Sequence, residues 1–188
     1  SSVVDLVYRG RAGQRLMGTT VGETDIRLRY DAGQVSIRPT TIDGWLGVLQ
    51  ATGELDVRQG PLNLDVQGSV QPERLASLGL TNIRGVGELS VRVYGDATGR
   101  SGPLSFEASL FYPRVGWGSD VEARQLMLRL DGSVHDDEWS GWVTLESGPM
   151  DVYGIGIDEM RTLRAQWSRD VDGRVVMAGQ TGLDGVRK

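Results

Sequence analysis

The only histidine of the chain, His135, stands in a polar cluster whose residue types could bind a metal ion or exchange protons. The cluster runs over Gly132–Glu138, and imidazole and carboxylate groups together ligate divalent ions. However, the adjacent Asp136 and Asp137 would point to opposite faces of a strand, which suits chelation poorly. Asp and Gly are also expected at a hairpin tip on turn chemistry alone. We interpret the cluster as a solvated turn and expect no metal site.

Other combinations that could do chemistry carry a weaker signal. Asp158-Glu159 offers an acid and a base, but its position after Tyr153–Ile157 favours a connection between strands. Gly154-Ile155-Gly156 and Gly85-Val86-Gly87 are similar to the start of a dinucleotide-binding loop, but each lacks the third glycine. The chain has no cysteine, no Gly-x-Ser-x-Gly motif and no phosphate-binding Gly-Lys-Ser/Thr motif. We therefore expect no enzyme activity and no cofactor.

Aromatic residues in the second half of the chain could form a ligand-binding surface: Trp117, Trp139, Trp142, Phe111 and Tyr112. Aromatic rings line some carbohydrate and lipid sites, but rings near strand ends more often complete a core, and we favour that interpretation here. A β-sandwich hydrolase or carbohydrate module would need carboxylates beside these rings. Asp136 and Asp137 are the candidates for that role, and this hypothesis ranks below the two given at the end of this section.

The elements that position these residues are expected to be strands. Apolar and polar residues alternate along most of the chain, as in Gly60–Val70 and Gly102–Pro113, which predicts strands with one apolar and one wetted face. Gly- and Asp-containing turns separate the strands, for example at Asp31–Gly33. In Val121–Leu130 the apolar parity slips by one residue, which predicts a β-bulge or a bend near Gln125.

Two segments depart from the alternation and predict short helices. Pro72–Leu80 has an early proline, a Leu-rich stretch and a glycine near its end. Thr41–Gln50 is similar, although Gly44 and Gly47 lower its helix propensity. The expected fold is therefore all-β: a curled, mainly antiparallel sheet, shaped like a β-taco trough, with one or two short helices.

The composition fits a curled sheet and excludes several classes of function. Of the 188 residues, 39% are hydrophobic and 27 are glycine, roughly twice the usual glycine share. Glycine within strands encourages curvature. The net charge of −5, with bases scattered singly, argues against binding to nucleic acid. No apolar run approaches the ~20 residues of a membrane helix. We expect residues 1–188 to be a single β-rich segment of a larger protein, with sub-units at 1–52, 53–117 and 118–188.

A loose internal repeat is also present. Gly53–Arg58 recurs in similar form as Gly87–Arg92, and the triplet Gly60–Leu62 recurs at Gly102–Leu104 and Gly148–Met150. Each triplet falls between two expected strands, so the repeated unit would be a pair of hairpins. The irregular spacing favours a stack of variable hairpins over a strictly periodic solenoid.

Five short pieces share a pattern in which strands of the form Gly-x-Leu-x-Val alternate with a Leu-rich helix: Gly60–Gly68, Leu75–Leu80, Gly85–Val93, Leu104–Leu110 and Tyr112–Gly116. With this pattern, Gly60–Arg129 resembles the repeat region of TamB and related AsmA-like envelope proteins. The resemblance implies a bridge-like lipid-transfer protein of the bacterial periplasm, whose parent is anchored in the inner membrane. It also implies an Omp85-type outer-membrane barrel as a partner of the C-terminal end of such a protein. No catalytic residue is carried over.

The leading hypothesis is a non-enzymatic segment whose hydrophobic groove carries phospholipid acyl chains between the inner and outer membranes and so supports outer-membrane assembly. Acyl chains need only a continuous apolar strip, since each buried CH₂ contributes ~0.8 kcal/mol. The residues expected to line the groove share the apolar parity of their strands: Leu62, Leu64, Val66, Leu104, Phe106, Ala108, Leu110, Leu126, Leu128, Leu130, Val143 and Leu145. Asp65, Glu107 and Arg129 have the opposite parity and are expected to face water. The alternative is a structural or adhesive β-solenoid of a surface protein, with a filled interior.

Overall fold

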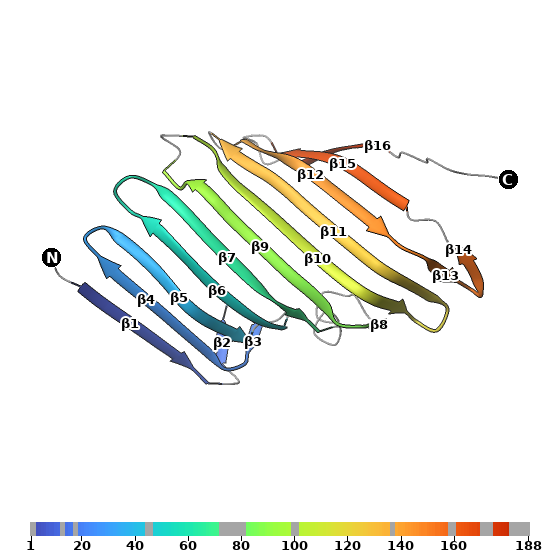
Figure 1. Ribbon diagram of the computed structural model, residues 1–188, viewed down its shortest axis with the longest axis horizontal. Coiled ribbons are helices and arrows are strands. Elements are labelled where there is room, and N and C mark those ends of the chain that lie inside the picture. Colours follow the sequence, from blue (N-terminus) through green and yellow to red (C-terminus); the bar gives the residue numbers. More distant parts are fainter. Residues whose placement is uncertain are drawn as a thin grey trace.

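The computed structural model describes residues 3–11, 14–16, 19–43, 47–71, 82–98, 102–135, 138–157, 161–169 and 175–180. These residues form strands and connecting turns and contain no helix. Fourteen strands belong to one antiparallel sheet, and the main path through it follows the order of the chain (Figure 1). The strands of that path are β1 (Val3–Gly10), β4 (Thr24–Asp31), β5 (Gln34–Asp43), β6 (Gly47–Asp56), β7 (Pro61–Val70), β9 (Gly87–Asp96), β10 (Leu104–Trp117), β11 (Val121–His135), β12 (Glu138–Ser147), β15 (Arg161–Arg169) and β16 (Val175–Gln180).

Five short strands complete the fold. β8 (Ile83–Arg84) pairs with β10, and β13 (Met150–Val152) pairs with both β11 and β14 (Ile155–Ile157). A separate two-stranded sheet is made by β2 (Gln14–Leu16) and β3 (Thr19–Val21). The main path begins at β1 and ends at β16 without pairing between them, so the sheet is not closed into a barrel. The expected fold class, an all-β curled and open sheet of antiparallel strands, is confirmed.

Two-residue turns join neighbouring strands where the sequence supplies residues that tolerate positive φ. Between β4 and β5, Asp31 pairs with Gln34, and the intervening Ala32 and Gly33 have φ of 49° and 100°. Positive φ at both central positions matches the twist of the two strands, which is why such turns favour hairpins. The turn predicted at Asp31–Gly33 is therefore confirmed.

The bend predicted near Gln125 is present. Gln125 has φ of 54°, and neither it nor the opposing Pro113 takes part in the β10–β11 ladder, although Tyr112 pairs with Leu126 and Arg114 with Arg124. Proline has no N–H to donate, so the ladder is interrupted at the same point on both strands. The register is unchanged beyond the interruption. Neither strand carries an extra residue, so the irregularity at Gln125 is a bend and not a bulge.

The helix predicted for Thr41–Gln50 is wrong in its described residues. Thr41–Asp43 ends β5, Gly47–Gln50 begins β6, and the two segments pair directly, with Ile42 opposite Leu49. Strand pairing prevails because it places Ile42 and Leu49 on the same side of the sheet as the other apolar residues, while two glycines weaken the helix. The helix predicted for Pro72–Leu80 lies outside the described residues.

A bulge in β5 shows how backbone N–H and C=O groups find hydrogen-bond partners where the strand pairing shifts. The register between β5 and β6 changes between Ile37 and Thr40, around Pro39. The buried Thr40 hydroxyl donates a hydrogen bond to the Arg38 carbonyl (2.8 Å) and accepts one from the Arg27 N–H (3.1 Å). A side chain thus replaces the ladder partner that the irregularity removes.

Candidate functional site

The twelve residues predicted to line a groove all lie on one face of the sheet. Direct cross-strand partners point to the same side, and so do alternate residues along a strand, so the rows of pairs that contain the twelve residues share one face. For example, Val66 pairs with Val91, Val91 with Ala108, Ala108 with Leu130, and Leu130 with Val143. We call the side of the sheet formed by the twelve residues and their cross-strand partners the apolar face, and the opposite side the polar face.

One row of direct partners crosses the apolar face from the first strand of the main path to the last. Every member is apolar or glycine: Leu6, Leu28, Ile37, Gly53, Leu64, Val93, Phe106, Gly132, Gly141, Trp167 and Met177. Neighbouring strands are about 4.8 Å apart, so the ten spacings of this row give a strip of roughly 48 Å. The apolar face is thus one uninterrupted surface that runs perpendicular to the strands.

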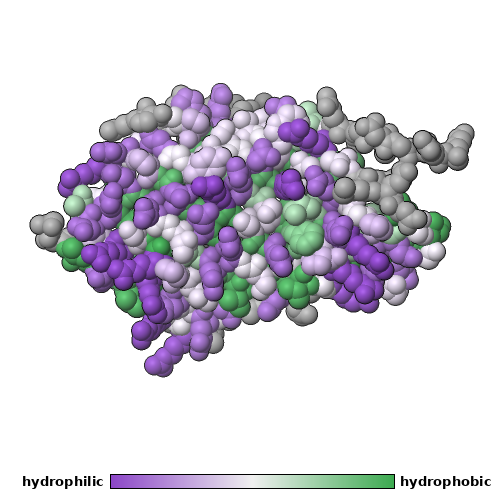
Figure 2. All heavy atoms as spheres, viewed as in Figure 1, coloured by the Kyte–Doolittle hydropathy of each residue, from purple (hydrophilic) through white to green (hydrophobic). Residues whose placement is uncertain are grey.

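The apolar face is only partly shielded from solvent. Among the described residues, the buried apolar side chains are Ala51, Val70, Tyr112 and Ala123, whereas Leu128 is 39% and Met177 63% exposed. The chain has 12877 Å² of accessible surface, against about 8,900 Å² for a compact protein of its mass. Figure 2 shows hydrophobic residues reaching the surface between the polar ones. Strands alone, with no second layer among the described residues, account for this exposure.

An aromatic cluster lies within the apolar face. The ring of Phe106 is 5.8 Å from that of Trp167 and 6.3 Å from that of Trp139, measured between centroids. Gly132 makes this packing feasible, because a Cβ there would be 2.7 Å from atoms of both Phe106 and Trp167. The sequence analysis assigned Phe106 to the groove but neither tryptophan. Trp167 has the same parity as Leu163 and Ala165, and this alternation was sufficient to place it on the apolar face.

Three polar atoms of the apolar face are buried without a hydrogen-bond partner among the described residues: the Thr24 Oγ1, the Tyr112 hydroxyl and the Trp167 Nε1. Burial raises the pKa of Tyr112 above its ordinary value. A buried hydroxyl that makes no hydrogen bond costs free energy. The row from Leu6 to Met177 contains only one of the three, the Trp167 Nε1, so this row has almost no fixed polar chemistry.

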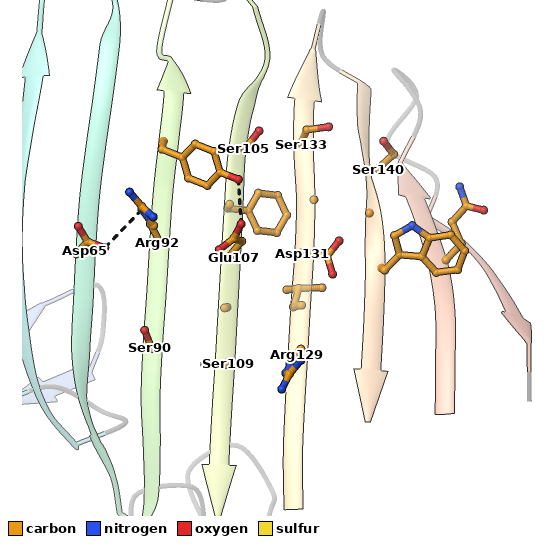
Figure 3. Close-up of a pocket in the computed structure, with 18 residues that line it drawn as sticks. Asp65, Ser90, Arg92, Ser105, Glu107, Ser109, Arg129, Asp131, Ser133 and Ser140 are labelled. Atoms are coloured by element: carbon orange, nitrogen blue, oxygen red, sulfur yellow. Dashed lines mark hydrogen bonds and ion pairs between the residues drawn. The ribbon is translucent and has the colours of Figure 1, made fainter. Parts of the chain in front are cut away.

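The polar face carries mixed charges that pair across the strands. One of its rows runs through Asp65, Arg92, Glu107, Asp131 and Trp142. Arg92 lies 3.8 Å from Asp65, and Glu107 accepts a hydrogen bond of 2.9 Å from the Tyr94 hydroxyl (Figure 3). That hydrogen bond is the main cause of the raised pKa of Tyr94. Asp65, Glu107 and Arg129 lie on this face, opposite the groove residues, as the alternation predicts.

A hollow of about 710 Å³ lies on the polar face, between β7 and β15. Its floor carries serines from β9, β10, β11 and β12, and charged side chains of both signs surround it (Figure 3). At its border Arg164 stacks on Trp142, with its Cζ 4.1 Å from the ring centroid. Asp65 and Arg92 of the lining pair with each other. Charges of both signs leave no single sign to select a ligand, and we assign the hollow no binding role.

The other candidates from the sequence do not form a reaction centre in the described residues. His135 ends β11 and is exposed, whereas Asp136, Asp137 and Asp158-Glu159 lie outside the described residues. Within the described ranges, no three ligating side chains gather in a group that could hold a metal ion. Trp117 lies at the end of β10 and Trp142 on the polar face, so the five aromatic residues of the second half do not share one surface.

Comparisons with protein-family models, with curated proteins and with solved structures find no match for this chain. None of the described segments is a helix with the length and hydrophobicity to cross a membrane. The apolar face is therefore characterised by its own geometry: a strip of roughly 48 Å, apolar along its whole length and half-exposed.

Proposed function

We propose that the chain is a non-enzymatic lipid-carrying segment, and that its apolar face holds the acyl chains of phospholipids. The observation that carries this proposal is the row from Leu6 to Met177, which stays apolar or glycine across every strand of the main path. Apolar patches beyond a few hundred Å² are uncommon on monomers and usually mark a binding surface. A face of this extent needs an apolar ligand to cover it.

The shape and chemistry of the face favour acyl chains over a compact ligand. Half of a bilayer's hydrocarbon core is about 15 Å thick, so the strip could hold roughly three acyl chains end to end. Burial along the strip would contribute ~0.8 kcal/mol per CH₂ with no need for directed polar contacts. Small-molecule sites, by contrast, usually add a few convergent polar groups to an apolar pocket, whereas the row from Leu6 to Met177 has one polar side-chain N–H, that of Trp167.

The cellular setting of this proposal rests on the resemblance to TamB and AsmA-like proteins. We place the segment in a periplasm-spanning parent anchored in the inner membrane, which passes phospholipids toward the outer membrane and supports its assembly. An Omp85-type barrel is the proposed partner at the outer membrane. The alternation of residues supports the lipid-binding face independently of this setting.

Photo-crosslinking tests the lipid-binding face directly. A photoreactive phenylalanine analogue at Phe106 should capture phospholipid from vesicles of phosphatidylethanolamine and phosphatidylglycerol, as detected by mass spectrometry of the protein. The matched control carries the same analogue at Glu107, one residue along β10 and on the polar face. Lipid captured at position 106 and absent at 107 supports the proposal. An absence of lipid at position 106, or equal capture at both positions, contradicts it.

A further inference from the structure

Three arginines gather around the carboxylate of Glu122 near the turn between β10 and β11 (Figure 1). Arg114 donates a hydrogen bond of 2.6 Å to Glu122, and the Nε of Arg124 lies 3.9 Å from the same carboxylate. The hydrogen bond from Arg114 is the main cause of the lowered pKa of Glu122, and the charges of Arg124 and Arg84 lower that pKa further. One carboxylate cannot neutralise three guanidinium groups, so the cluster carries an excess of positive charge.

Arg84, the third cation, reaches the cluster by lying across β10. It pairs with Gly116, and Gly116 pairs in turn with Glu122, so the three residues form one row across β8, β10 and β11. A Cβ at Gly116 would be 2.9 Å from the Arg84 Nη2 and 3.1 Å from its Nε, so the guanidinium lies directly over this glycine. No hydrogen bond or ion pair in the described part of the chain involves the Arg84 side chain. Its N–H groups are therefore available to a ligand.

A hollow of about 370 Å³ opens beside this row. Arg84 and Arg114 both line it, and Glu122 is the only acid among its lining residues. Val86, which is 57% exposed, and Pro113 add apolar surface to the lining. Pockets for small ligands have volumes of roughly 300–1,000 Å³. The hollow is thus a small site with an excess of cations and an apolar wall, and we call it the arginine hollow.

The neighbouring hollow has the opposite balance of charge. It also measures about 370 Å³ and shares Arg84 and Glu122 with the arginine hollow. Its other charged residues are Arg124, Asp120 and Asp151, so three acids oppose two cations. An anion that approaches this end of the sheet is therefore attracted to the arginine hollow and repelled from its neighbour.

We propose that the arginine hollow binds a phosphate group. Guanidinium groups bind phosphate oxygens through paired, charge-assisted hydrogen bonds, and two of them line this hollow. The apolar wall of Val86 and Pro113 favours a phosphate that carries an organic group, such as a phospholipid headgroup, over the free phosphate ion. The inference goes beyond the proposed function and does not depend on it, because these side chains need no acyl chain on the apolar face.

An NMR titration tests this site, with the arginine Nε–Hε signals as the readout at low ionic strength. The probes are inorganic phosphate, glycerophosphoglycerol and dihexanoylphosphatidylglycerol. Arg84→Gln should weaken binding by about tenfold or more, because the phosphate loses a charged hydrogen-bond donor. The matched control, Arg58→Gln, removes the same charge at the β6–β7 turn, at the opposite end of the strands, and should leave binding nearly unchanged. No shift with any of the three probes, or equal weakening by both substitutions, overturns the proposal.

Two further variants test the site by other means than loss of a cation. Gly116→Val keeps every charge but fills the space beneath the Arg84 guanidinium, and should weaken phosphate binding. Glu122→Gln removes the carboxylate that competes for Arg114 and should tighten binding by about threefold, as for unit charges roughly 6 Å apart in water. Its control is Glu107→Gln, in the middle of β10, which should have little effect. With folding checked by circular dichroism, unchanged binding to Gly116→Val or weaker binding to Glu122→Gln overturns the proposal.

The three probes also distinguish the source of the phosphate. Tighter binding of dihexanoylphosphatidylglycerol than of glycerophosphoglycerol assigns the site to a lipid headgroup, whereas tightest binding of inorganic phosphate assigns it to the free ion. Either result supports a phosphate site. Phe106→Arg should still bind inorganic phosphate, because Phe106 does not line the arginine hollow. A failure of lipid binding on the apolar face is therefore distinguishable from a failure of the phosphate site.

Discussion

Replacing Phe106 by arginine should separate the stability of the sheet from its capacity to hold lipid. The Phe106 ring packs on Trp167 and Trp139, at 5.8 and 6.3 Å between centroids. Each aromatic pair contributes about 0.5–1.5 kcal/mol, so Phe106→Arg should lower the free energy of unfolding by about 1–3 kcal/mol. The guanidinium can reach water above a face that is only partly shielded, so the folded chain does not have to bury the new charge.

Lipid binding should respond more strongly than stability. An acyl chain lying over β10 would have to bury the guanidinium, and burial of an unpaired charge is strongly unfavourable. A ligand at 100 times its dissociation constant stabilises a protein by about 2.7 kcal/mol. Urea denaturation followed by circular dichroism, with and without a short-chain phosphatidylcholine, should show a gain of this order for the wild-type chain. For Phe106→Arg the gain should be close to zero.

The matched control is Ser105→Arg, which adds the same charge one residue away on the polar face. Its cross-strand neighbours are Tyr94 and Ser133, neither of which is a cation. Ser105→Arg should keep the lipid-dependent gain in stability. A Phe106→Arg variant that also keeps this gain, or a Ser105→Arg variant that loses it, would refute the reasoning. A loss of stability well above 4 kcal/mol without lipid would also refute it, because truncation in a closed core costs about 3–5 kcal/mol.

Three further substitutions test local features of the sheet. In a urea titration, Thr40→Val should lower the free energy of unfolding by about 1–3 kcal/mol, because the Arg27 N–H and the Arg38 carbonyl lose their hydrogen-bond partner. Thr40→Ser keeps the hydroxyl and should retain most of the wild-type stability. Tyr112→Phe should leave stability unchanged or raise it, since its buried hydroxyl has no partner among the described residues; a clear loss would show that the hydroxyl is bonded. Glu107→Gln should bring the raised pKa of Tyr94 back toward its ordinary value in a spectrophotometric titration. The stabilisation from the Tyr94–Glu107 bond should be complete below the pKa of an unfolded tyrosine and disappear as pH rises through the folded value.

The period-2 alternation of the sequence predicts which residues share a face, because side chains on a strand alternate by simple geometry. It places Leu130 and Val143 on the same face without knowledge of the strand register. The change of parity near Gln125 likewise locates the bend. What it cannot supply is the partner of each residue. The contact between Tyr94 and Glu107 depends on the offset between β9 and β10, which hairpin length and turn type determine.

The helix expected at Thr41–Gln50 failed for a related reason. Its apolar residues fit a helical pattern locally, but Ile42 and Leu49 become direct neighbours once β5 and β6 pair. Both residues lie within the window from which the helix was predicted, but a periodicity count treats that window as one continuous element and does not detect that two strands pair within it. The same limit applies to exposure, since alternation predicts an apolar face but not whether another layer covers it.

The extent of the apolar face constrains what could cover it. The row from Leu6 to Met177 crosses the sheet over roughly 48 Å, whereas each partner in a standard protein interface contributes about 800 Å², a square patch with sides of ~28 Å. A ligand that follows the strip therefore has to be elongated and apolar, as an acyl chain is. Lipid along the strip would remove it from water, and the Phe106→Arg comparison tests whether it does.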